Sequence, residues 1–286
     1  MIAIVDGGST KCDWVILENN GKEFARAETV GFNPNIIDAH LIAEEIEKNT
    51  HLNSIKGSIK KIFYYGTGCG ILENQTIVKN QMQKVFNQAD ITVKEDITAA
   101  AFSAYQGKPA IICILGTGSN SCYFDGKEIR RELPSLGYLL GDEGGGCALG
   151  KHILRNFFMK KLPKDLESDF QKTYQLSINE LLQKMYHNPH ANAYLASFNT
   201  FIAERKSHPY IQHLIYREMK NFFEYHVLPY PESLSSEINF IGSIAFIYQD
   251  ILKSAAADYR LNIGTFVQKP IESLVDYHKK YILNLV

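Results

Sequence analysis

The chain has 286 residues, of which 45% are hydrophobic and 21% charged, and its formal net charge is −1. This composition is typical of a soluble globular protein and argues against a disordered or membrane protein. A nucleic-acid-binding protein would normally carry a basic excess or a basic stripe, and the sequence has neither. The length exceeds the usual size of one domain and predicts two, each with its own core.

The first residues, Met1-Ile2-Ala3-Ile4-Val5-Asp6, are apolar over too short a stretch for a signal peptide, and no apolar run approaches membrane-spanning length. We therefore expect a cytoplasmic protein with no membrane partner. The five cysteines are odd in number and form no C-x-x-C pair, so we expect reduced, buried thiols and neither disulfides nor a zinc ribbon.

The first third of the chain predicts an antiparallel three-stranded meander followed by alternating helices and strands. The expected strands are 2–5, 14–17, 24–28, 59–65 and one that begins at 91–93. Helices are expected after Asp38 and after Asn74, each residue being an N-cap candidate, and over the alanine-rich stretch 97–105.

The same order of elements begins again at Pro109. Strands are expected at 110–115, 121–124, 127–132, 238–241 and 261–267. Helices are expected from Gly146 to Phe158, over 244–257 and over 271–283, and a long helical insertion with a capping box at Ser177 and Glu180 spans about 164–228. The repetition predicts two α/β domains with mixed sheets and an interdomain cleft.

The domain boundaries follow from this order. We expect an N-terminal domain over 1–107 and a C-terminal domain over 108–270 that carries the insertion at about 164–228. The terminal helix, about 271–286, is free to pack back on the first domain.

Two glycine-rich turns stand at corresponding places in the two halves, Asp6-Gly7-Gly8-Ser9-Thr10-Lys11 and Gly116-Thr117-Gly118-Ser119-Asn120. Each is followed by a β-like stretch and then by Gly-Lys-Glu, at 21–23 and 126–128. Such turns bind phosphate, because glycine lets backbone N–H groups approach an anion and the hydroxyls add donors. The alternative is a plain tight turn between strands. Neither turn is a P-loop, since a strand follows each one.

These motifs resemble the actin-like ATPase and sugar kinase superfamily, and within it the branch of N-acetylglucosamine kinase and the BadF/BadG-type ATPases. The resemblance rests on the two turns, on Gly141-Asp142-Glu143-Gly144-Gly145-Gly146 and on Phe240-Ile241-Gly242-Ser243-Ile244-Ala245, which stand in the family's order. It spans nearly the whole chain, except that the helical insertion carries no recognisable motif. It implies two ribonuclease H-like domains and an ATP-dependent kinase that requires Mg²⁺.

Asp96 is the predicted catalytic base, because the resemblance places it in the family's Asp-Ala-Ala segment beside the acceptor. A kinase requires a carboxylate near the acceptor hydroxyl. The alternative interpretation is an N-cap of the helix that follows.

The resemblance also implies an ATP and magnesium site. Asp6 would orient a magnesium-bound water, with an ordinary turn residue as the alternative. The expected ATP-binding residues are Thr10, Lys11, Thr117, Gly118, Gly242 and Ser243.

The implied sugar site contains Asp96, Asn35 and Asp142. Asn33 is the less favoured alternative to Asn35 as the family's sugar-binding asparagine, and the alternative role of Asp142 is to complement a helix dipole. The other expected sugar-binding residues are Ser119, Asn120, Leu136 and Gly137. Where the N-acetylglucosamine enzyme has tryptophan in a Gly-Trp-Gly-His segment, this chain has Ser135-Leu136-Gly137-Tyr138, so the identity of the sugar is open.

The sequence thus predicts an ATP-dependent sugar kinase that acts on an amino sugar such as N-acetylglucosamine or glucosamine. The alternative is a BadF/BadG-type ATPase that activates another enzyme, which would need cysteines able to share an iron–sulfur cluster across a dimer. A third class, a nucleotide-binding regulator, would retain the phosphate turns and lose the base. A homodimer is an open option.

Overall fold

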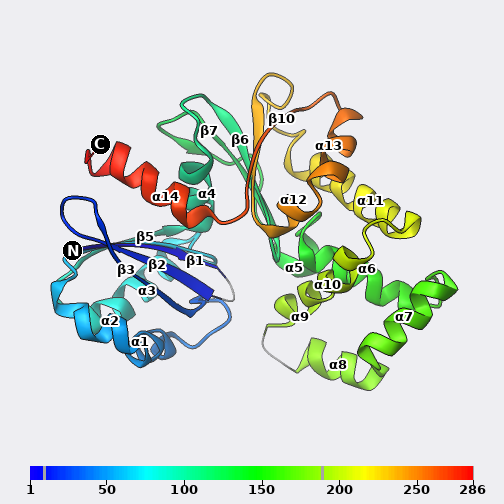
Figure 1. Ribbon diagram of the computed structural model, residues 1–286, viewed down its shortest axis with the longest axis horizontal. Helices are drawn as coiled ribbons and strands as arrows, with labels where there is room; N and C mark the ends of the chain where they lie inside the picture. Colours follow the sequence, from blue (N-terminus) through cyan, green and yellow to red (C-terminus); the bar gives the residue numbers. More distant parts are fainter. Residues whose placement is uncertain (9–10, 188–189, 286) are drawn as a thin grey trace. The chain divides into compact units, whose positions relative to one another are not determined.

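The computed structural model describes residues 1–8, 11–187 and 190–285. The chain divides into two compact units, the first formed by Met1–Gln106 with Lys269–Val286 and the second by Gly107–Gln268. Each unit is built on one five-stranded mixed sheet (Figure 1).

The sheet of the first unit has the order β3-β2-β1-β4-β5. Strands β1 to β3 form an antiparallel meander, whereas β4 and β5 run parallel to β1. The bounds are β1 Ile2–Gly7, β2 Lys11–Leu17, β3 Glu23–Val30, β4 Lys61–Gly66 and β5 Asp90–Glu95.

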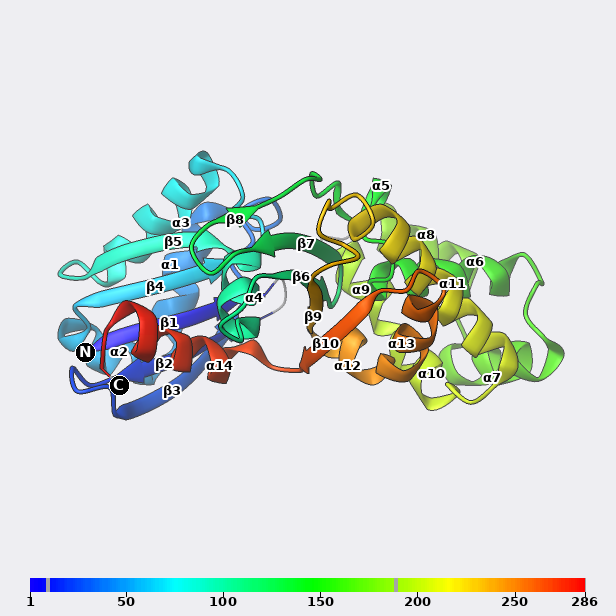
Figure 2. The same cartoon turned by 90° about the horizontal axis from the view of Figure 1, so that it is seen from above.

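Helices cover both faces of this sheet. One face carries Ala3, Val5 and Trp14 and packs in a core with residues of α1, α2 and α3; the other carries Ile4, Val15 and Leu17 and packs on residues of α4 and α14. This division follows from the two-residue period of a strand. In both views α14 lies beside α4 (Figures 1 and 2). The bounds are α1 Ala39–Lys48, α2 Thr50–Ile55, a 3₁₀ turn Lys56–Ser58, α3 Leu72–Val85, α4 Asp96–Ala104, α14 Pro270–Tyr277 and a π-helical turn His278–Ile282.

The sheet of the second unit repeats this topology with the order β10-β9-β6-β7-β8. Strands β6 to β8 form the meander, and β9 and β10 are parallel to β6. The bounds are β6 Ala110–Leu115, β7 Ser119–Phe124, β8 Ile129–Arg130, β9 Glu237–Ile241 and β10 Asn262–Val267.

One large core joins the second sheet to the helices of its unit, including those of the helical insertion. The bounds are α5 Gly137–Leu140, α6 Gly146–Phe158, α7 Lys164–Tyr174, α8 Ile178–Tyr186, α9 Ala191–Ser197, α10 Asn199–Glu204, α11 Pro209–His226, α12 Ser243–Ile247 and α13 Gln249–Ala257. The capping box at Ser177 and Glu180 is present at the start of α8. Within the described residues no helix has both the length and the apolar character needed to cross a membrane.

The predicted α/β fold with two mixed sheets is confirmed, and three local predictions are corrected. Asn74 is not a cap, because α3 begins at Leu72 after the N-cap Ile71. The helix expected over 244–257 is divided at Tyr248, which is buried in the core. The third strand of the second meander is only two residues long, Ile129–Arg130.

Candidate active site

Asp6 lies at the end of β1, on the sheet face that α4 and α14 cover. Ile4 packs on that face, and strand alternation puts Asp6 there as well. Asp13 lies directly opposite Asp6 in the β1–β2 register. Burial, together with the carboxylates of Asp13 and Asp96, raises the pKa of Asp6 to about 7, while Lys11 opposes this effect. The excess of negative charge favours a cation at this end of the sheet.

Asp96 is the first residue of α4 and follows β5 directly. Its N-cap is Glu95, so Asp96 itself is not the cap. The Thr67 hydroxyl donates to Asp96 Oδ2 at 2.9 Å, and the backbone N–H of Ile97 donates to Oδ1 at 2.8 Å. The backbone N–H of Thr67 donates to the Gly7 carbonyl at 2.8 Å. Thr67 therefore connects the end of β1 to the predicted catalytic carboxylate.

Asn35 lies in the turn between β3 and α1. Asn33 shapes this turn, because it is buried and its Oδ1 accepts the backbone N–H of Asn35 at 3.0 Å. The side chain of Asn35 is more exposed, and its Oδ1 accepts from Asn74 Nδ2 at 2.9 Å. Asn74 Nδ2 also donates to the Gly68 carbonyl at 2.7 Å. The loop after β4 thus contacts both Asp96, through Thr67, and Asn35, through Asn74.

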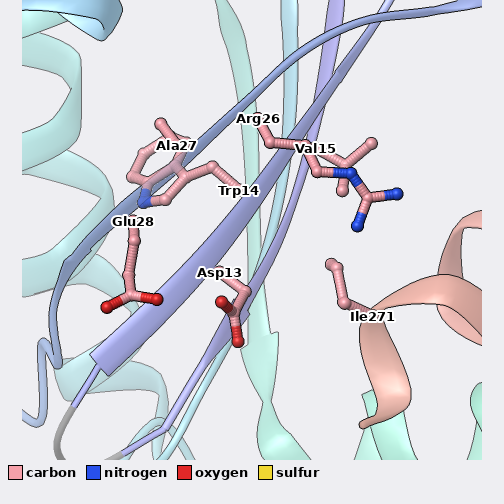
Figure 3. Close-up of a pocket in the computed structure, with 7 residues that line it drawn as sticks. All are labelled: Asp13, Trp14, Val15, Arg26, Ala27, Glu28 and Ile271. Atoms are coloured by element: carbon pink, nitrogen blue, oxygen red, sulfur yellow. The ribbon is translucent and has the colours of Figure 1, made fainter.

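Lys11 begins β2, and its ammonium group pairs with Asp13 and Glu28 at 3.0 Å each. Both carboxylates line a depression of about 360 Å³ on β2 and β3. Figure 3 shows Asp13, Arg26 and Glu28 extending from these strands, with Ile271 of α14 nearby. The hydrogen bonds to the two carboxylates raise the pKa of Lys11. The ammonium group at the end of the first glycine-rich turn is therefore already paired with Asp13 and Glu28.

In the second unit, the turn at 116–120 is joined to the start of α6. The backbone N–H of Gly146 donates to the Gly116 carbonyl, and that of Cys147 donates to the Thr117 carbonyl, both at 2.8 Å. The first N–H groups of a helix lack partners within the helix, and these two find theirs in the turn. The second phosphate segment and the Gly141–Gly146 segment therefore form one structure.

Asp142 holds this structure together. Its Oδ1 accepts the backbone N–H of Ser119 at 3.1 Å, and a Cβ on Gly118 would lie 2.5 Å from its Oδ2. Asp142 has a φ of 65°, a left-handed conformation that is strained for residues other than glycine and is often found at functional sites. Burial raises its pKa, whereas the Ser119 N–H lowers it. The Ser119 hydroxyl is buried without a partner in the described residues, and Asn120 Oδ1 accepts the N–H of Ser121 at 2.9 Å.

Helix α11 of the insertion contacts the same loop with residues spaced one turn apart. His226 Nε2 lies 2.9 Å from Glu143 Oε2, and Phe222 packs so closely on Gly144 that a Cβ there would lie 2.8 Å from the Phe222 Cβ. The N–H of Gly144 lies 3.5 Å from Glu218 Oε2. The i, i+4 and i+8 positions of α11 thus support the loop that carries Asp142.

The remaining predicted residues of the second unit lie at the edges of these segments. Gly242 is the N-cap of α12 with a φ of 113°, and a Cβ there would lie 2.4 Å from the Leu115 carbonyl oxygen. Ser243 is exposed at the start of α12. Leu136 is 58% exposed, and Gly137, with a φ of 67°, begins α5. Gly242 therefore adjoins the second turn, and Leu136 presents an apolar surface.

The structure thus groups the predicted residues separately within each unit. The first unit holds Asp6, Lys11, Asn35 and Asp96, and the second holds Thr117, Gly118, Ser119, Asn120, Leu136, Gly137, Asp142, Gly242 and Ser243. Thr10 lies outside the described residues.

Residues 5–207 match the family described as BadF/BadG/BcrA/BcrD ATPase. The chain belongs to this ATPase family. It is 27% identical over 176 residues to N-acetyl-D-glucosamine kinase of Dictyostelium discoideum, an alignment that covers 55% of this chain and 54% of the relative. The chain thus spans about half the length of the curated relative it matches.

Solved structures extend the similarity over nearly the whole chain. A Porphyromonas gingivalis protein, named provisionally as an N-acetylglucosamine kinase, is 34% identical with a TM-score of 0.91, covering 98% of this chain and 99% of that protein. A Chromobacterium violaceum protein with the same provisional name is 16% identical with a TM-score of 0.72, covering 96% and 98% of the two chains, which shows the fold alone. The resemblance to the N-acetylglucosamine kinase and BadF/BadG branch is therefore confirmed.

Sequence reasoning missed the site residues of the loop after β4, namely Thr67 and Gly68, and the helical residue Asn74. The alternating glycines in Gly66-Thr67-Gly68-Cys69-Gly70, directly after a buried strand, were the available indication. Glycine at alternate positions after a strand indicates a backbone that other groups approach closely.

Proposed function

We propose that this protein of the BadF/BadG/BcrA/BcrD ATPase family is an ATP-dependent kinase that phosphorylates a hydroxyl group of an amino sugar. The observation that carries the proposal is the Asp96 carboxylate, which Thr67 and Ile97 orient at the end of the first sheet. The names of the Dictyostelium and Porphyromonas relatives support N-acetylglucosamine as the candidate sugar.

Asp96 has the chemistry of a general base in this reaction. A carboxylate can accept the proton of the acceptor hydroxyl as the oxygen attacks the γ-phosphorus of ATP and ADP leaves. Two hydrogen-bond donors fix the orientation of the carboxylate, which reduces the reorganisation needed to reach the transition state.

The glycine-rich turns are the proposed ATP-binding segments. Backbone N–H groups near Gly118 and the hydroxyl of Thr117 would contact the phosphates, with Thr10 and Lys11 in the first unit and Gly242 and Ser243 on the adenosine side. Glycine is needed at 118 and 242, because a Cβ would come within 2.5 Å of Asp142 Oδ2 or 2.4 Å of the Leu115 carbonyl oxygen.

The residues present fit a magnesium ion held through water at Asp6. Mg²⁺ prefers oxygen ligands, retains several waters and is usually bound through one or two carboxylates together with substrate phosphates. The carboxylates of Asp13 and Asp96 add negative charge around Asp6, and a cation would neutralise it. In the described residues no group of three or more acidic, His or Cys side chains is placed to bind a metal directly. When bound, the ion would neutralise charge on the phosphates.

The proposed sugar-binding residues are Asn35, Asp96, Ser119, Asn120, Gly137 and Asp142. Leu136 stands in place of the family tryptophan. A carboxylate such as Asp142 can accept from two hydroxyls of a carbohydrate. The exposed Leu136 offers less apolar area than tryptophan, so we expect an altered or broader sugar preference.

The activator function is not favoured, because the cysteines do not suit an iron–sulfur cluster. All five are buried. Burial raises the pKa of Cys12, Cys69 and Cys147 to about 12 and raises the pKa of Cys113 well above its usual value, whereas cluster ligands are thiolates. Cytoplasmic location and a homodimer stay predictions.

The test is a panel of hexoses and amino sugars assayed with ATP and magnesium. N-acetylglucosamine or a related sugar should raise ATP turnover well above the sugar-free rate. Asp96→Asn should lower kcat at least about a hundredfold, because the amide cannot accept the proton, while magnesium-ATP binding persists. Asp142→Ala should raise the KM for sugar more than the KM for ATP.

Two results would contradict the proposal. If Asp96→Asn turns over near the wild-type rate, another group is the base. If no sugar stimulates turnover and an anaerobic preparation contains iron with a cysteine-dependent visible absorbance, the activator function replaces the kinase.

A further inference from the structure

The side-chain amide of Asn35 is connected to a second amide, that of Asn74, in a network that fixes which atom of Asn35 is free. Asn74 is buried on α3, and its Nδ2 donates to the Gly68 carbonyl at 2.7 Å and to Asn35 Oδ1 at 2.9 Å. Asn35 Nδ2 has no acceptor among the described residues. The free group of Asn35 is therefore its NH₂.

The backbone carbonyl of Gly68 determines this orientation. A carbonyl oxygen only accepts, so Asn74 must turn its NH₂ toward Gly68. The second hydrogen of that NH₂ then needs an acceptor, and Asn35 Oδ1 supplies it. An amide presents its oxygen on one side and its nitrogen on the other. Because the oxygen of Asn35 faces Asn74, the group of Asn35 that stays available is the NH₂, which donates.

Gly68 also allows the loop to approach both asparagines of the β3–α1 turn. It has a φ of +82°, and a Cβ there would lie 2.2 Å from Asn33 Oδ1 and 3.0 Å from Asn35 Nδ2. The loop after β4 is thus in contact with the turn that carries Asn35, and its glycine keeps that contact free of a side chain.

We propose that Asn74 is a positioning residue for acceptor recognition, which holds Asn35 with its NH₂ available to donate to an oxygen of the sugar. This rests on the proposed function and deepens it, because it assigns the polarity of one contact. The matching group on the acceptor is a hydroxyl or acyl oxygen with a free lone pair, and a protonated amine does not fit that position.

The test compares two substitutions of Asn74 with a neighbouring control. Asn74→Ala removes both hydrogen bonds and lets Asn35 rotate. In Asn74→Asp the side chain retains its shape but presents accepting oxygens, so it loses the hydrogen bond to the Gly68 carbonyl, and Asn35 should turn its NH₂ toward it and direct its oxygen at the sugar. Gln75→Leu is the control, because Gln75 Nε2 donates to the Cys69 carbonyl of the same loop at 2.9 Å but has no hydrogen bond to Asn35.

Both Asn74 variants should raise the KM for sugar by about tenfold, the value of one hydrogen bond, with the KM for ATP nearly unchanged. Gln75→Leu should change neither constant by more than about twofold. In an Asn35→Ala background, Asn74→Ala should have no further effect on the KM for sugar, since a residue that acts only through Asn35 loses its role there. Equal effects of the Asn74 and Gln75 variants, or additive effects in the double variant, would overturn the proposal.

Side-chain amide exchange measured by NMR on asparagine-labelled protein tests the orientation independently of activity. The NH₂ of Asn74 should exchange slowly and that of Asn35 quickly in the wild type, and the NH₂ of Asn35 should become protected in Asn74→Asp. The opposite pattern refutes the proposal. If no sugar is phosphorylated yet the expected exchange pattern is observed, the kinase function fails while the assigned polarity of Asn35 stands.

Discussion

Lowering the pH from 7.5 to 5 is expected to destabilise the first unit through His278. This side chain is fully buried, in contact with the ring of Phe63, and its Nε2 lies 2.9 Å from the Tyr65 hydroxyl. Its Nδ1 is also buried and has no hydrogen-bond partner in the part of the chain that the structure describes. Burial, assisted by the positive charge of Lys94, lowers the pKa of His278 from 6.5 to about 4.

The size of the effect follows from these two pKa values. The folded pKa lies below the unfolded one, so the unfolded state binds the proton more readily, and stability is complete above pH 6.5 and falls as the pH decreases toward 4. At about 1.4 kcal/mol per pKa unit, His278 should reduce the free energy of unfolding by about 2 kcal/mol at pH 5 and by about 3 kcal/mol well below pH 4.

The assay is urea unfolding of wild type and His278→Phe at pH 7.5 and pH 5. The only tryptophan, Trp14, is buried in the first unit, so its fluorescence reports unfolding of the unit that contains His278. The variant should be less stable than wild type at pH 7.5, by about 1 kcal/mol for the lost Tyr65 hydrogen bond, and its relative stability should improve by about 2 kcal/mol at pH 5. The carboxyl groups are common to both proteins, so their contribution to the pH dependence of unfolding cancels in this difference.

An exposed histidine provides the control. His40→Phe should leave the pH dependence of unfolding unchanged, because His40 lies on the surface of α1. If the stability difference between wild type and His278→Phe is the same at both pH values, His278 does not titrate as a buried neutral group and the reasoning is refuted.

Two further predictions concern the second unit. Gly118→Val should weaken magnesium-ATP binding at least about tenfold in calorimetry, because its Cβ would lie 2.5 Å from Asp142 Oδ2, and unchanged affinity would show that the turn does not contact phosphate. His226→Gln should raise the KM for sugar several-fold with little change in the KM for ATP, because the 2.9 Å contact between His226 and Glu143 supports the loop that carries Asp142. The control is His213→Gln, a substitution at an exposed position of the same helix. Equal effects of the two substitutions would contradict the role of His226.

Sequence periodicity predicted those elements whose ends are marked by local breakers. The strand Ala110–Leu115 has the predicted bounds because an apolar run is enclosed by Pro109 and Gly116. The helix predicted over 244–257 is undivided because its apolar pattern runs through Tyr248 without a glycine or proline, whereas the structure divides it at Tyr248, whose ring is buried in the core. A pattern of sequence cannot indicate such packing.

The same limit applies to the candidate site. The glycine-rich segments were found because their composition is local, and Asp96 because the segment that it begins resembles the family's Asp-Ala-Ala segment. The sequence predicts Asn74 as a helix cap, a common role of asparagine near a helix start, whereas the structure shows its side chain bound to Asn35, 39 residues away in the chain. Hydrogen bonds of that separation depend on the register of the whole sheet and leave no local pattern.

The return of the chain to the first unit at Lys269 has a consequence for biosynthesis. The sheet face formed by Ile4, Val15 and Leu17 is covered in part by Ile271, Leu274 and Val275 of α14, which the ribosome makes after the entire second unit. The nascent first unit therefore exposes an apolar strip while the second unit is being translated and folds. Such a strip is a binding site for chaperones and a risk for aggregation until α14 emerges.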